Sequence, residues 1–403
     1  MSAWLILSGA LLIQIVVANV TQGIPTLAPF IKADLSLSQS QVGLFTSYIF
    51  AGFFLGAGLS GWLTDRLSSR TVLIGGAACA GLIAAIIGYF QLDRIALVGL
   101  LMLLGLMGST ATPAGAQAVA RAFDTRQRGL AMGLRQMGVP LGGALAAASL
   151  PVLAVRSSWR TAAAVSGVVA LFAALITLFI YSRPRVRQHA RRSKTAHRQG
   201  QVSGKLFKKP VLIACAAGTT LPVAQFIMVT YLMLYLRDSL GIPELRGAAL
   251  LTLAQLIGAV SRVSFAALSD RLPFGRKPML LAVIAMTGLS ALSIAQLSAQ
   301  TPTILVTTVV MVYAASALGW QGLYFTLLTE LSDSGWEGRV LGLATTFTSL
   351  GIMSGPPLFG LLVDASSSYR PAWYALAAVV ASGFVMLLTV QEQPTRSVAP
   401  ATR

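Results

Sequence analysis

Charged residues are scarce in this chain of 403 residues, and acidic residues are the scarcest. Asp and Glu together number twelve, and charged residues make up 10% of the sequence against 55% hydrophobic residues. This balance, with a mean hydropathy of +0.75, excludes an ordinary soluble domain and indicates an integral membrane protein. Two cysteines, Cys79 and Cys215, both lie in apolar runs, so we expect neither a disulfide framework nor a cysteine metal site.

Two further absences concern chemistry. The sequence contains no Gly-x-x-x-x-Gly-Lys-[Ser/Thr] loop, so ATP is not the expected energy source. No Asp, Glu or His lies in the middle of an apolar run, so an intramembrane enzyme would lack an acid–base pair and a metal cluster. We therefore expect neither an enzyme nor a bound cofactor.

Long apolar runs dominate the sequence. A helix needs about 20 apolar residues to cross a hydrocarbon core, and an uncharged start, Met1-Ser2-Ala3-Trp4, predicts that the first run is a span and not a cleaved signal. The sequence predicts an all-α integral membrane protein with twelve transmembrane helices, at residues 4–30, 41–63, 70–90, 95–119, 129–152, 159–182, 210–236, 246–268, 277–297, 303–328, 338–363 and 371–390.

The basic residues give the orientation. The formal net charge of +18 would suggest a nucleic-acid partner in a soluble protein, but here Lys and Arg crowd into the short gaps between apolar runs. If the gaps are assigned alternately to the two sides of the membrane, the side that includes both termini holds 21 Lys and Arg residues and the other side holds seven. Because the cytoplasmic side retains positive charge, we expect both termini in the cytoplasm of a multi-pass plasma-membrane protein, such as one of a bacterial inner membrane.

A basic segment divides the spans into two sets of six. It carries no acid and both histidines, His189 and His197, and it fits either a solvated linker that anchors topology or a segment that binds lipid headgroups. The expected domains are an N-terminal six-helix half at 1–182, this cytoplasmic linker at 183–209, a C-terminal six-helix half at 210–390 and a cytoplasmic tail at 391–403.

Two pairs of motifs indicate an internal duplication. The pattern Leu-x-Asp-Arg-Leu occurs at 63–67 and again at 268–272, an offset of 205 residues. Residues 128–134, Arg-Gly-Leu-Ala-Met-Gly-Leu, are similar to residues 337–343, Glu-Gly-Arg-Val-Leu-Gly-Leu, at an offset of 209. Nearly equal offsets predict two pseudo-symmetric six-helix halves, as in many transporters.

The first motif resembles the loop signature of the major facilitator superfamily, Gly-x-Leu-x-Asp-Arg-x-x-x-Arg/Lys. The match is carried by Gly61, Leu63, Asp65, Arg66 and Arg70, and more loosely by Leu268, Asp270, Arg271 and Arg276. The resemblance implies a twelve-helix transporter in which Asp65 faces the start of the eleventh span near Gly338, and Asp270 the start of the fifth near Gly129, because a helix N-terminus is its positive pole. Charges that serve only to set topology are the alternative.

We expect conformational gating from seven residues near the cytoplasmic surface: Asp65, Arg66, Arg70, Arg121, Asp270, Arg271 and Glu330. The family's glycine–proline signature in the fifth span is degenerate here, at 138–143. Since that signature has been linked to antiporters, its weakness lowers the expectation of drug/proton exchange.

Two arginines lie inside spans, Arg135 in the fifth and Arg262 in the eighth. Charges in a bilayer are costly and should face a cavity or a partner. By helical rise each lies on the order of 10 Å from the cytoplasmic edge, and spans five and eight are neighbours in the resembled fold, which favours an anion bound between them. Arginines that reach the membrane surface or backbone carbonyls are the alternative. Arg262 also resembles the eighth-span arginine of monocarboxylate and related porters, although Gly258 stands where those often carry Asp.

Polar and aromatic residues on other spans complete the expected cavity, with ordinary helix packing as the alternative reading. The full expected substrate site is Arg262, Arg135, Tyr324, Trp320, Gln117, Gln22 and Tyr231.

The sequence thus predicts a secondary active transporter of a small anion, most plausibly a monocarboxylate, that works by alternating access. An efflux transporter for hydrophobic or cationic drugs is the alternative, and it would require an acid in the cavity. The expected partners are the anion, with or without a co-transported proton, and the lipid bilayer; one copy is expected to suffice. Since no titrating group lies mid-span, a proton would travel on the substrate or bind a boundary carboxylate such as Asp34 or Glu330.

Overall fold

The computed structural model describes residues 2–182, 208–271, 275–333 and 336–390. The predicted tail and all but the last two residues of the predicted linker lie outside these ranges. The helices are α1 Ala3–Thr26, α2 Ala28–Leu35, α3 Gln39–Arg66, α4 Ser69–Tyr89, α5 Arg94–Gly108, α6 Ala111–Ala122, α7 Thr125–Gln136, α8 Gly138–Arg156, α9 Trp159–Ser182, α10 Lys209–Gly218, α11 Thr220–Leu240, α12 Glu244–Arg271, α13 Arg276–Gln296, α14 Thr303–Gly319, α15 Gln321–Leu331, α16 Glu337–Ser366 and α17 Tyr369–Leu388.

Twelve segments are long and apolar enough to cross a membrane, as the sequence predicts. Many large apolar side chains point outward, among them Phe172, Phe179 and Leu289. A bilayer requires such an exterior, and it also requires that backbone groups pair within each span, which helices achieve. The protein is therefore a multi-pass, all-helical membrane protein.

Four spans are broken into two helices each: α5–α6, α7–α8, α10–α11 and α14–α15. Pro113, Pro140 and Pro222 follow the first three breaks by three or four residues. Proline has no N–H, so the carbonyl four residues earlier loses its helical partner and the helix bends there. The fourth break lacks a proline, but there the Leu318 carbonyl accepts a hydrogen bond from the Arg262 Nε at 2.9 Å.

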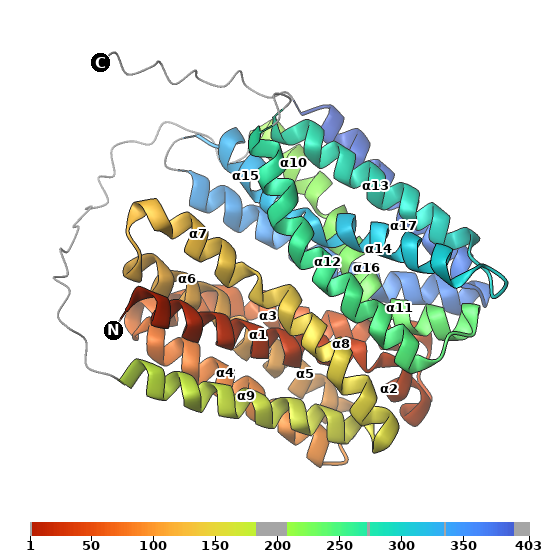
Figure 1. The fold of residues 1–403 in the computed structure, drawn as a ribbon, viewed down its shortest axis with the longest axis horizontal. Coiled ribbons are helices and arrows are strands. Elements are labelled where there is room, and N and C mark those ends of the chain that lie inside the picture. The colour runs from red at the N-terminus through yellow and green to blue at the C-terminus, as the bar shows by residue number, and fades with distance from the viewer. Residues whose placement is uncertain (1, 183–207, 272–274, 334–335, 391–403) are drawn as a thin grey trace.

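The chain forms two helical bundles. In Figure 1, α1–α9 form the lower bundle and α10–α17 the upper one. They contact each other mainly through α3 with α16 and through α8 with α12. One end of the molecule, which we call the basic end, carries Arg66, Arg121, Arg271 and Arg339. We call the other end the opposite end. In Figure 1, α7 and α12 separate toward the basic end, where the first residues of α1 also lie.

The buried contacts show which end is closed. The larger apolar cluster joins both halves, whereas a smaller cluster around Leu73, Ala114 and Phe123 belongs to the N-terminal half alone. Among the described residues, the hydrogen bonds between the halves lie in the middle or at the opposite end, such as Gln255 to Gln22 and the Thr46–Thr230 pair. The contacts that join the halves in the described part of the chain thus hold them together at the opposite end.

Candidate substrate site

Arg262 lies inside α12 and is 8% exposed. Its Nε donates to the Leu318 carbonyl at the end of α14, while its buried Nη2 has no hydrogen-bond partner. No ion pair joins it to a carboxylate in the described part of the chain. The side chain is thus held in place by one neutral acceptor and keeps hydrogen-bonding capacity for a negatively charged one.

Arg135 is held differently in the N-terminal half. It is 3% exposed, and its Nη1 and Nη2 donate to the Oε1 atoms of Gln14 and Gln136, each at 2.9 Å. Gly115 makes room for it, since a Cβ there would lie 3.2 Å from Nη1. Only Nε lacks a partner, so Arg135 is the better satisfied of the two arginines.

A pair of glutamines gives the depth of both arginines. Gln255 Nε2 donates to Gln22 Oε1 at 2.9 Å, and Gln22 Nε2 donates to the Val139 carbonyl at 3.1 Å. Gly143 lies directly against Gln255. Both arginines lie nearer the basic end than this glutamine pair. Arg262 follows Gln255 by seven residues, and Arg135 precedes Gly143 by eight. Seven or eight residues of helix span roughly 10–12 Å.

By this count the two arginines lie at a similar depth. The structure does not join them, because in the described part of the chain each one's hydrogen bonds go to groups of its own half. They lie on α7 and α12, the helices that separate toward the basic end in Figure 1. A movement that closes this end would bring the two side chains toward each other.

Trp320 and Tyr324 lie where the α14–α15 break meets the α10–α11 break, shortly after Leu318, whose carbonyl binds Arg262. Both are 1% exposed, and their rings pack edge to face at 5.5 Å. Trp320 Nε1 donates to Gln225 Oε1 at 3.1 Å, and the Tyr324 ring lies so close to Gly218 that a side chain there would collide with it. This aromatic pair packs against α10 and α11 and ties the two helix breaks together.

The remaining expected site residues are more scattered. Gln117 is half-buried on α6, two residues from Gly115, and Gln22 belongs to the glutamine pair. Tyr231 lies nearer the opposite end, where its hydroxyl contacts the carbonyls of Gln39 at 2.7 Å and Pro356 at 2.9 Å. The structure thus places Tyr231 in the contact between α3 and α16, apart from the arginines.

Sequence reasoning missed Gln255. It lies seven residues before Arg262 on α12, which puts the two side chains on one helical face. That spacing could have identified it. The degenerate glycine signature also has a packing role here, because Gly138 lies against Gln14 and Gly143 against Gln255.

The expected gating residues make contacts within each half. Asp270 pairs with Arg276 at 2.7 Å, and Arg276 pairs with Glu330 at 2.5 Å. A Cβ on Gly129 or Gly338 would meet nothing within 4 Å, and the ion pair of Asp270 is made with Arg276 of its own half. This is a difference from the contact that the resemblance implies.

The other basic gating residues are also partnered locally or exposed. The Arg66 guanidinium lies 4.4 Å from the Trp62 ring centroid, and Arg70 Nη2 donates to the Leu178 carbonyl at 3.4 Å. Arg121 and Arg271 are exposed, and the side chain of Asp65 lies outside the described part.

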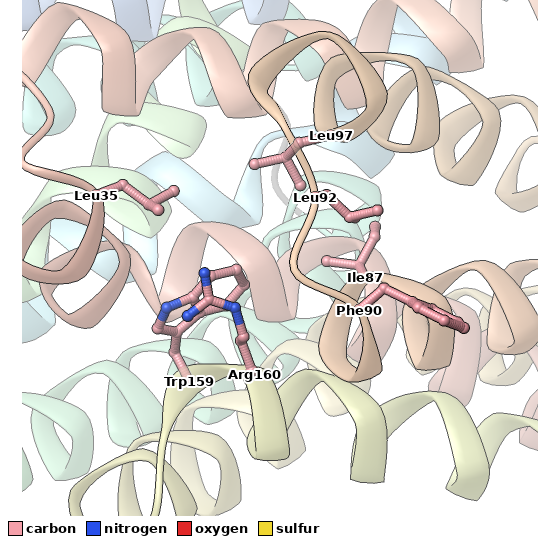
Figure 2. A pocket seen from close by; sticks show the side chains of 7 residues that line it. All are labelled: Leu35, Ile87, Phe90, Leu92, Leu97, Trp159 and Arg160. Atoms are coloured by element: carbon pink, nitrogen blue, oxygen red, sulfur yellow. The ribbon is translucent and has the colours of Figure 1, made fainter.

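Recesses elsewhere on the molecule do not include these residues. Figure 2 shows an apolar recess of about 10 Å³ between α2, α4, α5 and α9, lined by Leu35, Ile87, Phe90, Leu92, Leu97, Trp159 and Arg160. Its volume suits one water molecule at most. No group of His, Cys, Asp or Glu in the described ranges could hold a metal ion.

Comparison with known proteins decides the family. The family model described as Major Facilitator Superfamily matches residues 10–356 and 274–403. The chain belongs to this superfamily. As a major facilitator protein it is a transporter and not an enzyme, as the sequence motifs predict.

Relatives and solved structures agree with this assignment. An uncharacterised transporter of the superfamily from Mycobacterium tuberculosis is 29% identical over 92% of this chain and 81% of its own. Monocarboxylate transporter 13 of Rattus norvegicus is 27% identical over 83% of this chain and 76% of its own. The inward open xylose transporter from E. coli has the same fold, with a TM-score of 0.75 at 17% identity over 98% of this chain and 97% of its own.

Proposed function

We propose that this major facilitator transporter carries a small organic anion, with a monocarboxylate as the simplest candidate, and that its basic end faces the cytoplasm of a bacterial inner membrane. The observation that carries the proposal is a pair of buried guanidinium groups at a similar depth that have no carboxylate partner in the described part of the chain. A relative that bears the name of a monocarboxylate transporter supports it.

The charge balance of the interior favours an anion. The buried polar residues in the described part are Gln, Asn, Ser and Thr together with Arg135 and Arg262. A buried charge needs a counter-charge or a full set of hydrogen bonds, and Arg262 has neither. A cationic drug would require a buried acid, which this set does not contain.

The geometry suggests how the anion is held. Arg262 is fixed by the Leu318 carbonyl at the end of α14, so its Nη2, which has no hydrogen-bond partner, has a defined position. A carboxylate that binds there accepts a charge-assisted hydrogen bond. When the halves rock and the basic end closes, Arg135 approaches the same anion from α7.

The test is uptake and counterflow of labelled organic anions by purified protein in proteoliposomes. We expect Arg262→Ala to lower uptake about thirtyfold or more, because a buried ligand charge loses its partner, and Arg262→Lys to restore little, since a point charge does not replace the guanidinium fork. Arg156→Ala, at the exposed end of α8, is the control. Full uptake by Arg262→Ala, or counterflow with cationic compounds alone, would refute the proposal.

A further inference from the structure

The first residues of α3 are bound by the other half of the molecule. Of the first four backbone N–H groups of α3, those of Gln41 and Val42 are satisfied locally by Ser38. Those of Gln39 and Ser40 donate to the two carboxylate oxygens of Asp364, each at 2.8 Å. Asp364 is on α16, so a carboxylate of the C-terminal half caps a helix of the N-terminal half.

More contacts of the same kind surround Gln39. Its Nε2 donates to the Tyr369 hydroxyl at 2.8 Å, and its carbonyl accepts from Tyr231. Lys32 of the N-terminal half lies 3.8 Å from Asp238 of the C-terminal half. The start of α3 is thus the main polar junction between the halves at the opposite end.

We propose that Asp364 is a latch whose bonds to Gln39 and Ser40 hold the opposite end closed and thereby favour the state that is open at the basic end. A carboxylate at a helix N-terminus gains from both the charge-assisted bonds and the positive pole of the helix. Separation of the halves at this end must break both bonds. Asp364 is exposed, so water replaces the lost partners and the latch can release.

The latch would determine the balance of conformations whichever anion is carried, so it goes beyond the proposed function. The sequence motifs place Asp65 and Asp270 where they would cap helices at the basic end. Asp364 applies the same physical device at the opposite end, outside any motif. The two sets of contacts would alternate, since only one end can be closed at a time.

The experiment measures inter-half distances without substrate. Cys79 and Cys215 are first replaced by serine, and nitroxide labels are attached to cysteines at Ser157 and Gln300 for the opposite end, and at Gln127 and Arg339 for the basic end; all four sites are exposed. In Asp364→Asn we expect the ratio of opposite-end-open to opposite-end-closed molecules to rise about tenfold, as the loss of bonds to a charged group predicts.

Asp34→Asn is the matched control, because Asp34 lies at the same end but pairs with Trp159 and Arg160 of its own half. It should leave both distance distributions unchanged. A second pair, Gln39→Pro and Gln39→Ala, tests the donor side, since both remove the side chain and only proline also removes the N–H. Ser38 has the extended conformation that a following proline requires.

Proline should open the opposite end more than alanine does, and it should add little to Asp364→Asn in the double variant. Distances unchanged from the parent in Asp364→Asn, or equal in the proline and alanine variants, would overturn the latch. Because either comparison suffices, a variant that fails to fold does not remove the test.

Discussion

The two ends of the molecule use carboxylates in different ways. At the opposite end Asp364 of one half caps a helix of the other half. At the basic end Asp270 and Glu330 bind Arg276 of their own half. The chemistry is alike, but only the first arrangement links the halves. The comparison teaches that the conformation is determined by which helix start a carboxylate can reach, and not by how many charges an end carries.

Among the variants that test this comparison, the largest effect should come from the close packing that lets Asp364 reach α3. A side chain at Gly360 would collide with the Gln39 backbone and the Tyr231 hydroxyl. We expect Gly360→Val to force α3 and α16 apart and to reduce transport about tenfold or more, as overpacking costs predict. Gly342→Val on the same helix, where a Cβ meets nothing within 4 Å, is the control. Equal transport by the two variants would mean that this contact has no role in the cycle.

A smaller effect is expected at the basic end. Asp65→Asn should shift the population toward the state described here by about two- to fivefold, because it removes a carboxylate that would interact with a helix pole only when the basic end is closed. Inter-half distances at that end report the shift. If substrate affinity falls while the distances stay the same, Asp65 has been assigned the wrong role.

Neutralising one carboxylate at each end of the molecule should have a still smaller effect, here on the rate of anion exchange. With no Asp, Glu or His buried beside the arginines in the described part of the chain, the double variant Asp34→Asn, Glu330→Gln should keep anion counterflow at equal pH within about twofold of the parent, since arginine stays charged across the working range. Net uptake that responds to a pH gradient is compatible with this result. Loss of counterflow at equal pH would show that a boundary carboxylate is essential.

The smallest effect concerns stability. The hydrogen bond from Trp159, together with the Arg160 charge, lowers the pKa of Asp34 from its ordinary value of 3.8. A lowered pKa in the folded state contributes stability above the ordinary value, and this contribution is lost as the pH falls through the folded-state pKa. Asp34→Asn should therefore lower the unfolding free energy by less than about 1 kcal/mol.

The thermal midpoint in detergent measures this difference. The gap between Asp34→Asn and the parent should be constant at neutral pH and should close below about pH 4, near the ordinary pKa of an aspartate. A gap that persists at lower pH would mean that Trp159 and Arg160 stabilise the fold without Asp34.

The sequence predicts the twelve spans because length and hydropathy decide what can cross a bilayer. Motif offsets predict the two halves, and a similar offset of 210 residues separates Thr110 and Trp320, the N-cap residues that follow two of the helix breaks. The common depth of Arg135 and Arg262 also follows from counting residues along straight helices. These features are local or periodic, so they can be recognised without tertiary structure.

The partners of the site residues could not be predicted. That Arg262 binds the Leu318 carbonyl, or that Asp364 reaches Gln39, depends on how α12 meets α14 and how α3 meets α16. Those approaches require close packing at glycines such as Gly319 and Gly360. Tyr231 is a further example. Helical spacing predicts on which face of its helix Tyr231 lies, but it does not predict which other helix packs against that face.

The hydrogen bonds of Arg135 have a consequence for how the protein is made. An arginine at the centre of a span opposes insertion from the translocon by about 2.5–3.5 kcal/mol, and the segment that begins with α7 also carries Arg128 near its start. Gln14, which binds Arg135, is on α1 and is synthesised much earlier. The fifth span therefore enters the bilayer beside a helix that already offers its guanidinium an acceptor. A partner 121 residues upstream would thus offset part of the insertion cost of this span, and Gln14 would act before the finished transporter exists.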